Sequence, residues 1–165
     1  MATDNELITD VLESQYKAAL IMLRLAIEKV PDHLWDNRVY RNPIWQLTFH
    51  TLWAAKIYLS ASPQTFIPWG NAHRGAENLR ETPTCEAHTA TELLQFIDQL
   101  AAGLKSDITP LPLNKPSGFE WYPVSRLELH LINIRHIQHH TAQIIERLKA
   151  IGLTGFDWAI EGRDK

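Results

Sequence analysis

The sequence predicts an all-α protein, a four-helix bundle with long connecting loops. Four segments repeat apolar residues at three- and four-residue steps, the spacing that gives a helix one apolar face. No segment shows a convincing strand pattern. The chain has 165 residues, which suits one domain with its own hydrophobic core, so we predict a single domain over residues 1–165. Amphipathic helices of this length bury their apolar faces against one another in an antiparallel bundle.

The first predicted helix covers residues 6–30, and Pro31 ends it. The second has the clearest start signal in the chain. Asn42 is expected to supply the N-cap side chain, and Pro43 is expected to take the first helical position. This helix is predicted to run to about Ser60.

The third helix is predicted to start at Thr89 or Thr91 and to end near Lys105. The fourth is predicted to cover residues 125–151, because Gly152 is a natural stop for a helix. These two segments complete the four helices of the predicted bundle.

Residues 61–88 and 106–124 form two long connections. Loops of this length often act as lids or crossovers. Their aromatic side chains can be interpreted as the roof of a pocket or as a cover over the ends of the bundle, and we favour the cover. The residues concerned are Phe66, Trp69, Phe119, Trp121 and Tyr122.

Composition restricts the partners and the compartment. The formal net charge is −3 and there is no basic cluster, which argues against nucleic acid as a partner. Cys85 is the only cysteine, so no internal disulfide can form. The N-terminus is polar and acidic rather than signal-like, and the longest strongly apolar run, residues 18–23, is too short to span a bilayer. We therefore expect a cytoplasmic protein that does not bind a membrane.

Three histidines are candidate metal ligands. His136 and His140 are one turn apart in the fourth helix, so both rings lie on one face. His50 lies among apolar residues on the second helix, where an unpaired imidazole is costly to bury. Three imidazoles on facing helices can hold a divalent ion and leave a coordination position open. From position alone, core histidines paired by hydrogen bonds are an equal alternative.

The other histidines are assigned no metal. His33, His73 and His88 fall in or near loops and are expected to be solvated, and His130 lies about 120° round the fourth helix from the pair. His139 is expected at the boundary of the metal-binding face. It is a candidate general base, but a purely structural role fits its position better, and no catalytic residue is assigned.

Asn133 and Gln143 share the helix face of His136 and His140. Each is a candidate to orient a ligand ring or a substrate, because metal-bound histidines need partners that fix their tautomers. Zinc is our first choice of ion by ligand type. Nickel, iron and manganese are alternatives, because imidazole accepts all of them.

Other chemistries lack their motifs. The sequence contains no Glu-x-x-His, no HExxH, no glycine-rich phosphate loop and no CxxC. Cys85 is an ordinary free thiol by its local sequence. Paired histidines also suit axial ligation of haem, but nothing in the sequence favours haem over a small ion.

The fourth predicted helix has a second apolar face, opposite the histidines. A helix that is apolar on both sides is buried on both sides. This indicates either a subunit interface or cover from a loop, and we predict a homodimer. The residues of this face are Leu127, Leu131, Ile134 and Ile145.

Two segments resemble the DinB/YfiT-like superfamily. Residues 42–56, Asn-Pro-Ile-Trp-Gln-Leu-Thr-Phe-His-Thr-Leu-Trp-Ala-Ala-Lys, are similar to its second helix. Residues 135–143, Arg-His-Ile-Gln-His-His-Thr-Ala-Gln, are similar to its last core helix, where His-x-x-His-His-Arg-Gly-Gln is usual. The chain departs from that pattern at Thr141-Ala142, which leaves the histidines in place but replaces Arg-Gly.

The resemblance implies a four-helix bundle, often dimeric, with a divalent ion on His50, His136 and His140. Some members are transferases or isomerases that use low-molecular-weight thiols. The resulting hypothesis is a metal-dependent hydrolase or thiol-dependent transferase that acts on a small molecule, with a low-molecular-weight thiol as the partner in the second case. The alternative is a non-catalytic dimeric bundle that binds a metal or another ligand.

Overall fold

A computed structural model of the chain describes residues 4–73 and 75–162. The prediction of an all-α bundle is confirmed. In these two ranges the chain forms no β-strand, only one isolated bridge between Pro116 and Ser125. The predicted domain, residues 1–165, also includes residues 1–3, 74 and 163–165, which lie outside the described ranges. The elements are α1 (Asp4–Glu28), α2 (Asp32–Trp35), α3 (Ile44–Leu59), η1 (Pro63–Thr65), α4 (Ala90–Ile108) and α5 (Arg126–Lys149).

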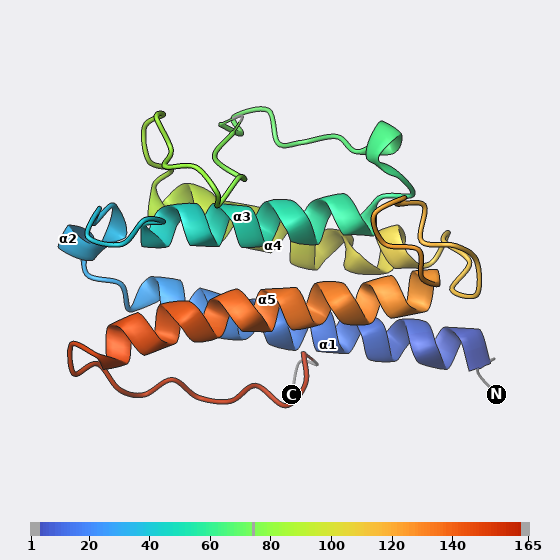
Figure 1. The fold of residues 1–165 in the computed structure, drawn as a ribbon. Helices are drawn as coiled ribbons and strands as arrows, with labels where there is room; N and C mark the ends of the chain where they lie inside the picture. Colours follow the sequence, from blue (N-terminus) through green and yellow to red (C-terminus); the bar gives the residue numbers. More distant parts are fainter. Residues whose placement is uncertain (1–3, 74, 163–165) are drawn as a thin grey trace.

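The four long helices form a bundle in which each packs against two neighbours. Both α1 and α3 contact α4 and α5 (Figure 1). The sequence had suggested an antiparallel bundle, but the neighbouring helices are not all antiparallel. Figure 1 shows α3 and α4 running in one direction and α1 and α5 in the other. The reason is the 60–89 connection, which returns along α3 to the end of the bundle where α3 began, so α4 starts beside the start of α3.

Helix starts follow the capping signals, with one exception. Thr89 and Glu92 form a capping box at α4, and the Ser125 hydroxyl accepts from the Glu128 amide at α5, so both helices start where the sequence had placed them. Asn42 is not the N-cap of α3. Pro43 occupies that position, and the Asn42 side chain instead donates to the carbonyl of Leu79 at 3.0 Å. A tertiary contact has replaced the local cap.

Helix α3 is buried on nearly all sides, because the 60–89 connection covers the face that α4 and α5 leave open (Figure 1). Side chains at four-residue steps, from Asn42 just before α3 to His50 within it, hold the connection in place. The Asn42 amide donates to Leu79 O, the Gln46 amide donates to the carbonyls of Asn78 and Glu81, and the His50 ring contacts the carbonyl of Glu77. These bonds satisfy buried polar groups on both partners.

Most of the loop aromatics pack against side chains of α3 and α4, although Trp121 is 55 % exposed. The Trp69 ring stacks on Phe96 of α4 with 4.2 Å between centroids. The Phe66 ring packs on Trp53, and Phe119 is 2 % exposed. The connection that contains Phe119 is held by the buried Arg126 side chain, which donates to the carbonyls of residues 60 and 61 just beyond α3.

The segment after α5 is extended and lies along α1. The Lys29 ammonium donates to Thr154 O, and the Gly162 amide donates to Ser14 O at 3.1 Å. The second apolar face of α5 is only partly covered, because Ile134 is half-buried against the core whereas Leu131 is 55 % exposed. Among the described helices, none is both long enough and apolar enough to cross a membrane.

Candidate metal centre

The structure brings His50, His136 and His140 together, although His50 lies 86 residues before His136. Because α3 and α5 pack side by side, the Nε2 atoms of His50 and His140 each lie 3.1 Å from Nε2 of His136. One ring nitrogen from each residue lies within 4.8 Å of the other two. His140 is buried and the other two rings are half-buried, so the cluster lies at the edge of the core.

Hydrogen bonds fix the tautomers of two rings. His50 Nδ1 lies 2.6 Å from the carbonyl oxygen of Glu77, and His140 Nδ1 lies 2.7 Å from Oε1 of Gln143. Both partners are acceptors, so both Nδ1 atoms carry the proton. The Nε2 atoms of His50 and His140 are therefore unprotonated, and the lone pair of each faces Nε2 of His136.

This arrangement lacks a donor. Nε2 of His136 can give a proton to one of the two lone pairs but not to both. Moreover, Nδ1 of His136 is buried and has no protein hydrogen-bond partner among the described residues. A cation between the rings resolves the conflict at the Nε2 atoms, because it accepts all three lone pairs, although Nδ1 of His136 still has no partner among the described residues. Nitrogens held about 2.1 Å from a zinc ion lie roughly 3.0–3.4 Å apart, and the observed spacing of 3.1 Å fits that geometry.

The rings are neutral and ready to act as ligands. Burial, followed by repulsion from the neighbouring imidazoles, lowers the pKa of His136 to about 3. Burial lowers the pKa of His140 to about 4 against the opposing bond from Gln143, and burial also lowers the pKa of His50. A histidine binds a metal in its neutral form. Protonation therefore does not compete with a metal at neutral pH.

Glu77 is a site residue that the sequence did not reveal. Its carbonyl accepts from His50, its carboxylate raises the pKa of His50, and its Oε2 atom is buried without a protein hydrogen-bond partner among the described residues. Glu77 lies in an irregular loop with no motif around it. Only the return of the 60–89 connection over α3 places it beside His50.

The two candidate orienting residues differ. Gln143 contacts His140, as proposed from the sequence. Asn133 instead donates its amide to the carbonyl of Ala55 and so ties α5 to α3. Thr141, in place of the usual arginine, is buried and donates its hydroxyl to Ile137 O within the same helix. The departure at Thr141-Ala142 thus leaves the three rings undisturbed.

The remaining histidines lie outside the cluster. His139 is exposed, with its ring centroid 5.0 Å from that of His140. His33 is exposed, as expected, and His130 is fully buried against Tyr16. The prediction that His88 is solvated was wrong. His88 is fully buried and stacks on Phe49, because the 60–89 connection carries it onto α3.

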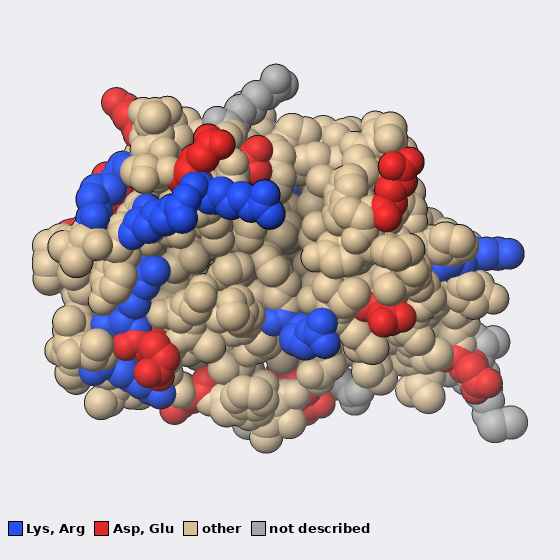
Figure 2. Space-filling model, viewed as in Figure 1, with Lys and Arg blue, Asp and Glu red and all other residues tan. Residues whose placement is uncertain are grey.

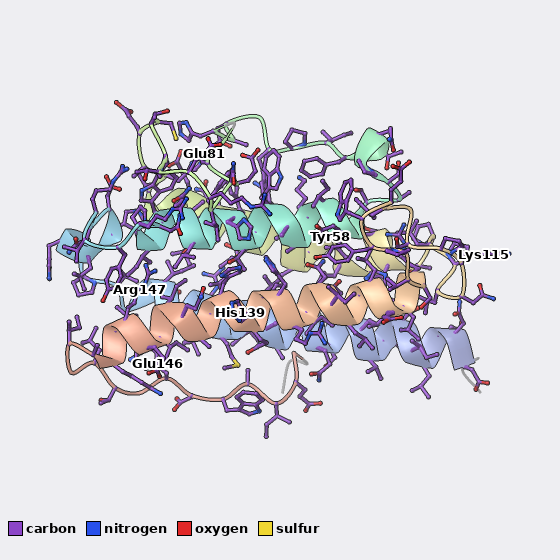
Figure 3. All side chains as sticks on the ribbon, viewed as in Figure 1. Tyr58, Glu81, Lys115, His139, Glu146 and Arg147 are labelled. Atoms are coloured by element: carbon purple, nitrogen blue, oxygen red, sulfur yellow. The ribbon has the colours of Figure 1, made fainter. Side chains whose placement is uncertain are left out.

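The surface around the seam between α3 and α5 carries charges of both signs. Figure 2 shows Lys, Arg, Asp and Glu scattered in small groups, with no broad area of one sign on this face. Figure 3, in the same view, labels His139 and Arg147 on α5 along its seam with α3. The seam that contains the cluster is therefore not a strongly charged surface.

A helical bundle with three histidines converging from two helices defines a class of candidate metal-binding protein. Comparison with protein families gives the relationship more closely: the family model of the DinB superfamily matches residues 15–144, well over half of the chain. The chain belongs to the DinB superfamily, as the resemblance of its two histidine segments had indicated. Searches of curated proteins and of solved structures found no match.

Proposed function

We propose that this protein binds one divalent metal ion through Nε2 of His50, His136 and His140 and uses it in a reaction on a small molecule. The observation that carries the proposal is the convergence of three imidazole Nε2 atoms, 3.1 Å from His50 to His136 and 3.1 Å from His140 to His136, which a bound cation would satisfy together. Membership of the DinB superfamily supports it. Zinc is the preferred ion, because three neutral imidazoles suit it.

A bound divalent ion supplies Lewis-acid activation of a nucleophile at neutral pH. The protein's own residues set the conditions for that chemistry. Glu77 O and Gln143 Oε1 hold two ligand rings in the required tautomer. The Glu77 carboxylate is our candidate to accept a proton, because it is near enough to His50 to raise the pKa of that ring and its Oε2 lacks a protein partner among the described residues.

The reaction we favour is hydrolysis or transfer of a group to a low-molecular-weight thiol. Both need a nucleophile that is weakly acidic and a site that offers an open position beside three protein ligands. The alternative is a bundle that binds a metal or ligand without catalysis. A substrate screen separates the two, because Glu77→Gln should slow turnover of a true substrate while leaving metal binding intact.

Metal content is the first test. The full chain is purified without a histidine tag or chelating column, loaded with zinc, dialysed and analysed by elemental mass spectrometry. We expect about one ion per chain in wild type and little or no retained zinc in His50→Ala, His136→Ala and His140→Ala. His139→Ala is the matched control, because His139 is exposed and adjacent, and it should keep its ion.

Two results would contradict the proposal. Wild type that takes up neither zinc nor nickel would make the three histidines core residues. Equal zinc content in wild type and in all three alanine variants would place the ion elsewhere. Circular dichroism of each variant shows whether the helices are retained, so a loss of metal can be separated from a loss of fold.

A further inference from the structure

A second feature of the α3–α5 seam is a cavity at the end of the bundle where α5 finishes. The cavity has a volume of about 190 Å³ and is open to solvent on one side. The segment between α2 and α3 forms one wall, and the last turns of α5 form the other. We name it the Arg147 pocket after its one charged lining residue. Its lining residues are Leu34, Asn37, Val39, Tyr40, Ile44, Arg147 and Ile151.

The guanidinium of Arg147 is held in a fixed position. Its Nη1 donates to the carbonyl of Asn42 at 2.8 Å, and its central carbon lies 4.2 Å from the centroid of the Tyr40 ring. The stacked ring and the backbone bond leave most of the guanidinium's five N–H donors for other partners. A preoriented guanidinium of this kind is suited to bidentate binding of a carboxylate.

Arg147 has no anionic partner of its own. Among the described residues it forms no ion pair, and its acidic sequence neighbour, Glu146, pairs with Lys149. Burial lowers the pKa of Arg147, because the charged guanidinium loses part of its hydration in this position. A half-buried cation in an apolar cavity lacks a counter-ion that a ligand can supply.

The Arg147 pocket lies on the same side of α5 as the histidine cluster. Arg147 follows His140 by seven residues, which is two helical turns, or about 10 Å along the axis. Gln143, which contacts His140, lies between them on that face. Figure 3 shows Arg147 and His139 labelled on α5 along its seam with α3.

We propose that the Arg147 pocket binds the carboxylate and the apolar body of the small molecule on which the three-histidine site acts. The substrate class is therefore a carboxylic acid with an aromatic or branched apolar group. The guanidinium of Arg147 binds the carboxylate, and the walls of the pocket bury the apolar group. The assignment of this ligand as substrate rests on the proposed function, whereas the binding itself does not.

Benzoate is the appropriate probe. An apolar cavity of about 150 Å³ is enough for a benzene ring, so the Arg147 pocket has room for one. Benzamide has the same shape without the charge. Both are titrated into the zinc-free full chain, with chemical shifts followed by ¹H–¹⁵N NMR. Zinc-free protein excludes coordination of the carboxylate by a metal.

We expect benzoate to bind at least about tenfold more tightly than benzamide, because a hydrogen bond between two charged groups is stronger than one to a neutral amide. Arg147→Gln should remove that preference, and Arg147→Lys should retain part of it. Lys149→Gln is the matched control, since it removes an exposed cation from the same helix end, and it should leave benzoate binding unchanged.

Equal affinity for benzoate and benzamide would overturn the assignment, as would an equal loss in Arg147→Gln and Lys149→Gln. If Arg147→Gln does not fold, the ratio of benzoate to benzamide affinity in wild type and in Arg147→Lys still tests the assignment. Zinc binding distinguishes the two proposals. Failure of benzoate binding with zinc content intact overturns only this one, and absence of zinc with benzoate bound overturns only the proposed function.

Discussion

Acid should destabilise this protein through His130, a buried histidine outside the metal cluster. His130 is fully buried between α5 and α1, where the hydroxyl of Tyr16 lies 3.0 Å from its Nδ1. Its Nε2 has no protein hydrogen-bond partner among the described residues. Burial, and then the nearby charge of Arg126, lowers the pKa of His130 from 6.5 to about 4.

The direction of the change in stability with pH follows from the number of protons bound by the folded and unfolded states. Between pH 6.5 and about pH 4 the unfolded chain binds a proton at this ring and the folded protein does not. Lower pH in this window therefore favours unfolding. The pKa difference corresponds to about 2 kcal/mol of stability lost through His130 between pH 7 and pH 5. The full stabilisation is present above pH 6.5.

The test is His130→Asn, which places an acceptor near Tyr16 but has no proton to bind at these pH values. Urea unfolding of the zinc-free protein, followed by tryptophan fluorescence, gives the free energy of unfolding at pH 7 and pH 5. The variant will be less stable at pH 7, because it leaves a small cavity. The decisive quantity is the drop between the two pH values, which should be about 2 kcal/mol smaller than in wild type.

His33→Asn is the matched control, because His33 is exposed. It should show the same drop as wild type. The other buried histidines contribute equally to wild type and to His130→Asn, so they cancel in the comparison. A drop in His130→Asn that matches wild type within about 0.5 kcal/mol would refute the reasoning.

Three further predictions concern the fold, the metal and the assembly. Gly118→Ala should lower the free energy of unfolding by about 2 kcal/mol or more, because Gly118 has φ +85° and an added Cβ would lie 2.1 Å from Ala61 O. Gly70→Ala is the control, since an added Cβ there meets no atom within 4 Å, and it should cost little. Thermal unfolding compares the two variants. Gln143→Ala should weaken zinc binding about tenfold in calorimetric titration, and an unchanged affinity would remove Gln143 from the site. Light scattering at micromolar concentration should give twice the 18.9 kDa chain mass, and Leu131→Glu should give one chain mass; wild type at one chain mass would contradict the homodimer.

Local sequence carried most of the secondary structure and two of the three histidines. The 3.6-residue periodicity found all four long helices, and Thr89 and Ser125 located the starts of two of them. The spacing of His136 and His140 put both rings on one helix face, because that relation depends only on helix geometry. The apolar surroundings of His50 indicated that it faces inward.

The tertiary structure decided what the sequence could not. The path of the 60–89 connection sets the directions of α3 and α4, places the Glu77 carbonyl against His50 and buries His88, which local sequence had placed in solvent. The same path takes the Asn42 side chain away from its expected cap. These features depend on contacts between residues distant in the chain, and hydropathy or spacing carries no signal for them. Helix geometry depends on neighbouring residues and can be predicted from the sequence, whereas the contacts of a loop depend on residues that are brought together only when the chain folds.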